Sequence, residues 1–106
     1  MAVSAATRAF VLDLFEGLGG VSVRAMMGGL AVYSEGRIFA LVPSDERVYL
    51  KASGAFAEAL ATAGGEQFTY ARRGARPARM GYWSLPDAAL DDPEAACGWA
   101  ARALEP

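Results

Sequence analysis

The sequence predicts an α+β domain in which helices pack on one face of an antiparallel sheet of about five to six strands. Apolar residues first follow a helical period. A long stretch rich in β-branched and aromatic residues comes next, broken by turn formers but by no helix. The expected order is one helix, three to four strands, a second helix, two strands and a last helix. A parallel doubly wound sheet would need a helix between nearly every pair of strands, so it is excluded.

The length of 106 residues suits one domain over positions 1–106. Apolar residues make up 54% and charged residues 21% of the chain, which is a globular composition. No apolar run approaches the roughly 20 residues that span a bilayer. The first fifteen residues are polar at too many positions for a signal peptide, so a cytoplasmic location is expected.

The first helix is predicted over Ala5 to Leu18, with Ser4 as its N-cap and a run of glycines at its end. Its apolar residues recur at helical spacing and define one buried side. They are Phe10, Val11, Leu14, Phe15 and Leu18.

A meander of four strands should follow, with turns at Glu35-Gly36 and at Pro43 to Glu46. The third strand is apolar on both alternating faces, as in a central strand, whereas the fourth alternates and should have one wet face. The expected strands are Val21–Met27, Leu30–Ser34, Arg37–Val42 and Arg47–Lys51.

The second half of the chain predicts a helix from Ser53 to about Ala63 and strands over Gln67 to Ala71 and Arg79 to Trp83. Ser84 to Asp87 has the spacing of a capping box, and Asp92-Pro93 starts a last helix that reaches Leu104.

The chain has no histidine, which excludes Ser/His/Asp and Cys/His nucleophilic sites and Cys/His zinc sites. Cys97, the single cysteine, is expected to act as a small hydrophobe. Asp91 and Asp92 are expected to cap a helix and not to act as an acid/base pair. We therefore predict no enzyme, no catalytic residue, no metal and no cofactor.

An arginine-rich stretch is the best candidate for nucleic-acid contact, because guanidinium groups bind phosphate and nearby aromatic rings can stack on bases. The alternative is a solvated hairpin tip, and the sequence pI near 5.0 argues against avid nonspecific binding. The arginines are Arg72, Arg73, Arg76 and Arg79, with Tyr70, Tyr82 and Trp83 close in sequence.

Gly28-Gly29 lacks the following helix that a phosphate-binding loop requires, so the pair is expected to allow a bulge, a bend or a close backbone approach. Arg24 either faces a partner or pairs with a carboxylate. Met26 and Met27 are expected to fill the core. A small-ligand pocket beside Arg24 and the glycines is a further, weaker hypothesis.

Several motifs in order resemble the N-terminal domain of the TfoX/Sxy family. They are Arg24-Ala25-Met26-Met27-Gly28-Gly29, Tyr33, Gly36-Arg37, Phe39-Ala40, Tyr49-Leu50-Lys51, Phe68-Thr69-Tyr70 and Tyr82-Trp83-Ser84-Leu85-Pro86. The resemblance covers nearly the whole chain. It departs from the family pattern at Met27 and at Leu30-Ala31, where other residues are common.

The resemblance implies a secretion-chaperone-like α+β fold and a non-catalytic regulatory role. Members of this family act with a transcription activator in competence for DNA uptake, so a protein partner is expected, with the transcription machinery as the candidate. In full-length regulators a C-terminal helical domain follows, and a chain ending at Pro106 is expected to be a stand-alone form. Because edge strands of small sheets can pair, a homodimer is a further hypothesis.

Overall fold

The computed structural model describes residues 3–26, 28–70 and 78–105. Its helices are α1 (Ala5–Leu14), α2 (Gly54–Thr62) and α3 (Pro93–Ala103), and two short 3-10 turns are η1 (Glu16–Leu18) and η2 (Asp87–Ala89). Its strands are β1 (Val21–Met26), β2 (Gly29–Ser34), β3 (Arg37–Val42), β4 (Tyr49–Lys51), β5 (Gln67–Tyr70) and β6 (Ala78–Ser84). None of the helices in these ranges has the length and apolar content of a membrane span.

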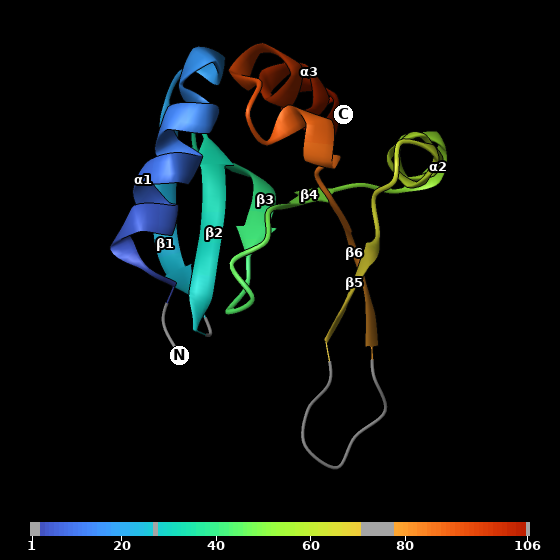
Figure 1. The fold of residues 1–106 in the computed structure, drawn as a ribbon, viewed down its shortest axis with the longest axis horizontal. Helices are drawn as coiled ribbons and strands as arrows, with labels where there is room; N and C mark the ends of the chain where they lie inside the picture. The colour runs from blue at the N-terminus through green and yellow to red at the C-terminus, as the bar shows by residue number, and fades with distance from the viewer. Residues whose placement is uncertain (1–2, 27, 71–77, 106) are drawn as a thin grey trace.

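The strands form one six-stranded sheet in the order β1-β2-β3-β4-β6-β5, with every neighbouring pair antiparallel (Figure 1). The predicted α+β class and element order are confirmed. β1 to β4 are a meander, and β2 turns into β3 at Glu35 and Gly36, whose φ values of 49° and 82° are left-handed as the hairpin turn requires. After α2, β5 forms the outer edge and β6 returns beside β4.

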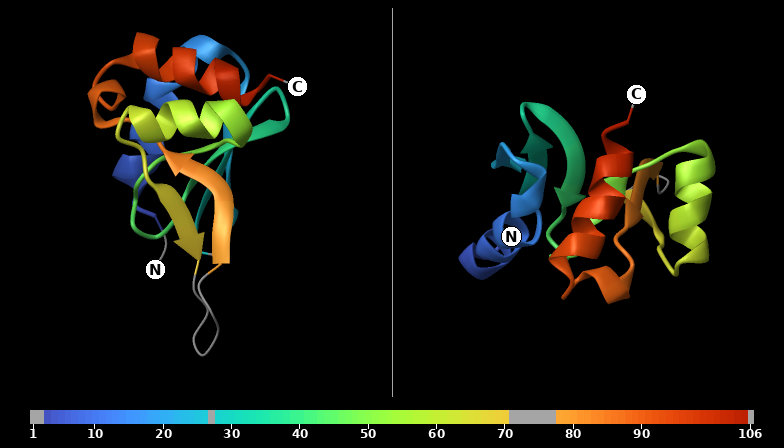
Figure 2. Two further views of the ribbon diagram at one scale, coloured as in Figure 1. Left: turned by 90° about the vertical axis from the view of Figure 1, so that its right-hand side faces the viewer. Right: turned by 90° about the horizontal axis from the view of Figure 1, so that it is seen from above.

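The core lies between the sheet and the helices. The ring of Phe15, which follows α1, meets that of Phe39 of β3 edge to face, with centroids 5.1 Å apart. α3 lies between α1 and α2 (Figure 2). The ring centroids of Phe56 in α2 and Trp99 in α3 are 6.2 Å apart, and the Arg102 guanidinium lies 4.9 Å from the first and 5.4 Å from the second. Apolar packing and cation–π contacts therefore join α2 to α3.

Two of the predicted helix caps form, at Ser4 and Asp92, whereas Ser53 stands at the N-cap position of α2 without a side-chain cap bond. The side chains of Ser4 and Asp92 accept hydrogen bonds from the backbone N–H groups of Thr7 and Ala95, at 3.1 and 3.2 Å. The predicted end of the first helix is wrong, because α1 stops at Leu14 and the chain continues as η1. The tighter turn brings Gly17 against α3, where an added Cβ would lie 3.3 Å from the Cys97 sulfur.

The fourth strand differs from its prediction in length and in burial. β4 begins at Tyr49 because the preceding segment turns: Glu46 has a φ of 62°, and the Arg47 backbone N–H donates to the Asp45 carboxylate at 2.9 Å. The expected wet face is present at Arg47 and Lys51, which are exposed, but Tyr49 between them is buried. Tyr49 is only 4% exposed, since the Phe68 ring packs on it with centroids 4.9 Å apart.

The predicted capping box at Ser84 is not formed. Ser84 is buried at the end of β6, and its hydroxyl accepts a hydrogen bond from the Glu66 backbone N–H at 2.8 Å. Pro86 occupies the N-cap position of η2 and makes no side-chain cap bond. The hydroxyl therefore joins β6 to the start of β5 and does not cap the turn.

The glycine pair shapes the junction of β1 and β2, as expected. Gly28 has a left-handed φ of 82°. Gly29 is buried, and a Cβ at this position would collide with the Val42 carbonyl oxygen and lie 2.8 Å from the Pro43 Cα. Both obstacles are backbone atoms that cannot rotate away, so β2 can approach the end of β3 only with glycine at position 29.

Replacing Gly29 with alanine should therefore destabilise the domain by about 1–3 kcal/mol, a typical cost of forcing extra volume into a packed site. Gly98→Ala is the matched control, because Gly98 lies in α3 with nothing within 4 Å of an added Cβ. It should stabilise by roughly 0.5–1 kcal/mol through helix propensity. Chemical denaturation of both variants measures the difference, and equal stabilities would contradict the close-approach argument.

Candidate functional site

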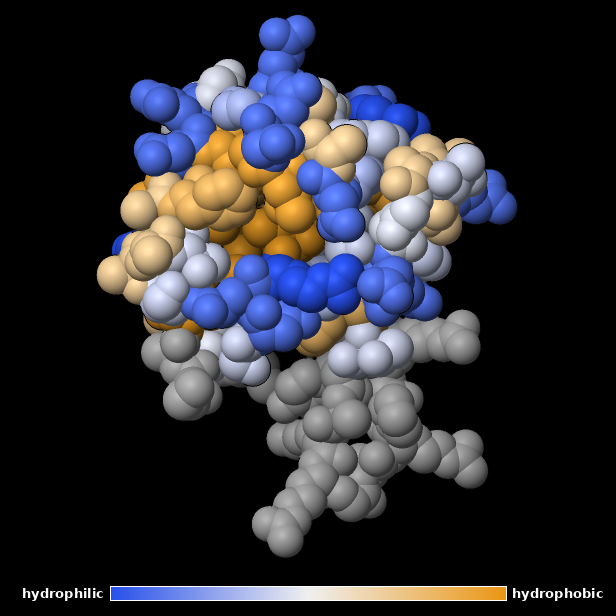
Figure 3. All heavy atoms as spheres, viewed as in Figure 1, coloured by the Kyte–Doolittle hydropathy of each residue, from blue (hydrophilic) through white to orange (hydrophobic). Residues whose placement is uncertain are grey.

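An apolar hollow opens on the side of the sheet that carries the helices (Figure 3). Phe10 of α1, Val48, Leu85 and Leu90 line it, and its volume is about 160 Å³. Val48 and Leu85 are buried and form its floor, whereas Phe10 is 41% exposed. The helical period placed Phe10 on the buried side of α1, so its exposure departs from the prediction. In Figure 3 the apolar area faces the viewer and is surrounded by polar side chains.

The rim of the hollow is polar and comes from the β3–β4 loop and from the segment that leads from β6 into η2. Glu46 and Arg47 belong to the β3–β4 loop, Ser84 ends β6, and Asp87 starts η2. One oxygen of the Glu46 carboxylate accepts hydrogen bonds from the Ser4 backbone N–H and the Thr7 hydroxyl, both at 2.9 Å. The β3–β4 loop is thus fixed to the first turn of α1, the helix that supplies Phe10.

Those hydrogen bonds alter the titration of Glu46. The bond from the Ser4 backbone N–H, followed by the side-chain bonds from Ser4 and Thr7, holds the pKa of the Glu46 carboxyl below its ordinary value of 4.5. The carboxylate therefore keeps its charge into moderately acidic solution, and the charged form favours attachment of the loop to α1.

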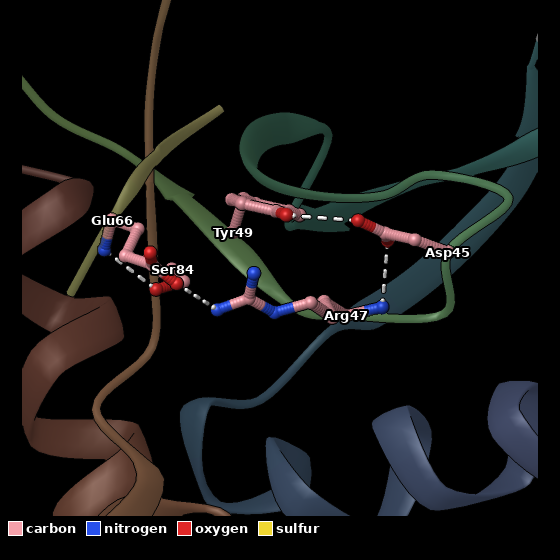
Figure 4. A network of polar contacts seen from close by, with 5 residues as sticks. All are labelled: Asp45, Arg47, Tyr49, Glu66 and Ser84. Carbon is pink, nitrogen blue, oxygen red and sulfur yellow. Dashed lines mark hydrogen bonds and ion pairs between the residues drawn. The ribbon is translucent and has the colours of Figure 1, made fainter. Parts of the chain in front are cut away.

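A second polar network connects the loop to the sheet (Figure 4). The Tyr49 hydroxyl donates to the Asp45 carboxylate at 2.9 Å, and the Arg47 guanidinium donates to the Glu66 carboxylate at 3.1 Å. The Arg47–Glu66 ion pair is solvent-exposed, so it contributes little stability. Burial of the Tyr49 ring, followed by the hydrogen bond to Asp45, raises the pKa of this phenol to about 12. The network ties Arg47, which lines the hollow, to Glu66 just before β5.

The opposite face of the sheet carries most of the tyrosines of the resemblance. The strand register puts Arg24, Ala31, Leu41 and Tyr49 in one row, alternating with core residues such as Val32 and Leu50. This row faces away from the residues that pack against the helices. We call it the helix-free face.

Arg24 contacts one tyrosine of the helix-free face. The Arg24 guanidinium lies 5.7 Å from the centroid of the Tyr33 ring. Burial, followed by the charge of Tyr33, raises the pKa of the Tyr82 phenol. Among the described residues Arg24 forms no ion pair with a carboxylate, and its contact there is with an aromatic ring. That Arg24 faces a partner stays a prediction.

The other predicted site residues are scattered. Arg72, Arg73 and Arg76 lie outside the described residues, as does Met27. Arg79 belongs to β6 and pairs in register with Thr69, while Tyr70 pairs with Ala78. Met26 is 40% exposed, so its prediction as a core residue is wrong. Arg24 and Arg79 lie on β1 and β6, which are not neighbours in the sheet.

Sequence reasoning missed the residues of the hollow. The segment from Pro43 to Glu46 was predicted only as a turn, and Phe10 only as a core residue. The hollow combines positions far apart in the chain, so no local period could reveal it. The one available signal was the density of charge in Asp45-Glu46-Arg47, which exceeds what a short turn needs.

The family model for the TfoX N-terminal domain matches residues 13–106. The chain belongs to this family. A comparison with curated proteins finds no match. The TfoX N-terminal domain match includes every strand and the hollow residues Val48, Leu85 and Leu90, and it begins after Phe10. The predicted resemblance is thereby confirmed for nearly the whole chain.

The Glu46 attachment predicts an acid-sensitive contribution to stability. Because the pKa of Glu46 is lowered in the folded state, its contribution is present above the ordinary value of 4.5 and is lost as the pH falls through the lowered value. Thermal unfolding of wild type should therefore show a steeper loss of stability below pH 4.5 than Glu46→Gln. Glu58→Gln, an exposed site on α2, should retain the wild-type slope; parallel curves for wild type and Glu46→Gln would contradict the assignment.

The raised pKa of Tyr49 predicts that the domain loses stability as the pH rises in alkaline solution. A folded-state pKa raised from 10.0 to about 12 favours the native state fully below pH 10, and this contribution is lost as the pH rises toward 12. Denaturation across that interval should show wild type losing more stability than Tyr49→Phe. In Asp45→Asn the phenol loses its charged acceptor, so ultraviolet titration should detect ionisation of Tyr49 at lower pH than in wild type. An unchanged titration in Asp45→Asn would show that Asp45 has no influence on the phenol.

Proposed function

We propose that this TfoX N-terminal domain is a non-catalytic regulatory domain that acts through contact with a protein partner. Two findings support the proposal: membership of the family, and an apolar hollow that leaves Phe10 exposed beside a polar rim. An exposed apolar area with a polar border is typical of surfaces that bind other proteins. The hollow is the observation that carries the proposal.

The family resemblance suggests what kind of regulation this is. Regulators with this domain act with a transcription activator, so we infer that the partner belongs to the transcription machinery. The proposal contains no catalytic step. Its competitors are nucleic-acid contact through Arg72, Arg73, Arg76 and Arg79, and binding of a small ligand.

Affinity purification of the tagged domain from its native host, followed by quantitative mass spectrometry, should recover at least one protein in near-stoichiometric amount. The affinity tag alone, expressed in the same host, provides the control for nonspecific capture. Absence of any enriched protein, together with a small molecule that stays bound in native mass spectrometry, would overturn the proposal.

Nucleic-acid contact makes a separate prediction. If the arginines bind phosphate, affinity for DNA or RNA should fall steeply with salt, and Arg72→Ala/Arg73→Ala should reduce both the affinity and the slope. Fluorescence anisotropy with single- and double-stranded oligonucleotides measures this. Absent or salt-independent binding would remove this competitor and leave protein contact.

A further inference from the structure

Phe10 has an unusual position for a large apolar side chain. Among the residues that the structure describes, two large hydrophobic side chains are exposed, Phe10 at 41% and Met26 at 40%. Phe10 lines the hollow, whereas Met26 ends the edge strand β1. The helix that carries Phe10 is fixed to the β3–β4 loop by the two hydrogen bonds to Glu46. This wall of the hollow is therefore held in place before any partner binds, which lowers the entropic cost of binding.

The size of the hollow matches one side chain. Its volume is about 160 Å³. An engineered protein cavity of about 150 Å³ holds one benzene molecule. The hollow can thus receive one leucine, methionine or phenylalanine side chain, which would cover Phe10 and Leu90 and contact the buried floor.

The charges around the hollow are mostly negative. Glu46 and Asp87 line it. Among the described residues of the lining, Arg47 is the one cation. Its guanidinium donates to the Glu66 carboxylate, and its backbone N–H donates to the Asp45 carboxylate. Two carboxylates thus line the hollow beside one guanidinium, whose charge is already paired with Glu66. A basic segment would be attracted to this rim, whereas an acidic peptide or a nucleic acid would be repelled.

We propose that the hollow binds a protein segment in which one large apolar side chain is flanked by lysine or arginine. The apolar side chain enters between Phe10 and Leu90, and the basic residues lie over Asp87 and Glu46. This inference rests on the proposed function and names the chemistry of the partner. It assigns the contact to this side of the molecule and not to the helix-free face with Arg24.

Selection of a phage-displayed library of random peptides on the wild-type domain, at physiological ionic strength, tests the proposal. The recovered sequences should share a leucine, methionine or phenylalanine next to lysine or arginine. A synthetic consensus peptide should bind Phe10→Ser about ten-fold more weakly than wild type, as expected for losing the burial of one aromatic side chain. Asp87→Lys should weaken binding, and the remaining affinity should depend less on salt.

Met26→Ser is the matched control, since it removes an equally exposed hydrophobic residue that does not line the hollow, and it should leave the affinity unchanged. Circular dichroism and thermal unfolding of each variant verify the fold. Leu90→Ser provides a second test on the other wall of the hollow. Recovery of no binding peptide, recovery of acidic peptides, or equal affinity of wild type, Phe10→Ser and Leu90→Ser would overturn the proposal.

Sedimentation analysis tests the alternative occupant. A wild-type dimer that becomes a monomer in Phe10→Ser would show that a second copy fills the hollow, and would overturn the proposed partner chemistry. The two proposals fail separately. If a native partner binds Phe10→Ser as tightly as wild type, this inference is wrong and protein contact stands. If no protein is enriched and a small molecule stays bound, the proposed function itself is wrong.

Discussion

The close approach of two backbones at Gly29 is the constraint on which the rest of this domain depends. With no Cβ at Gly29, β2 can lie directly against Val42 and Pro43 at the end of β3. Pro43 has no N–H to continue the ladder, so the chain turns there into the β3–β4 loop. That loop carries Asp45, Glu46 and Arg47. The glycine that identifies the family motif thus also determines where the charged loop begins.

Each side of the hollow is fixed in place by its own hydrogen bonds. On one side, Glu46 fixes the β3–β4 loop to the first turn of α1, which carries Phe10. On the other, the Leu85 backbone N–H donates to the Val48 carbonyl at 2.9 Å and holds the start of the η2 segment against the loop. No helix in the described part of the chain covers the space between them. An apolar floor beneath a charged rim is the arrangement that gives both affinity and selectivity in protein recognition.

Local chemistry predicted the helices and strands well because their signals are short-range. The Ser4 and Asp92 caps, the Glu35-Gly36 hairpin and the β3 strand all agree with the structure. A prediction was wrong where a side chain bonded to a distant segment in place of its sequence neighbours. Ser84 had capping spacing, but its hydroxyl bonds to Glu66 eighteen residues away.

The sequence by itself determined the α+β class, the order of the elements, the family and the absence of histidine chemistry, because periodicity, turn residues and ordered motifs are properties of neighbouring positions. Only the tertiary structure decided that Phe10 is exposed and that it shares a hollow with Val48, Leu85 and Leu90. The same holds for Arg24, which lies over Tyr33 on the helix-free face. The physical reason is that burial and charge environment depend on which elements pack together, and no local pattern records this.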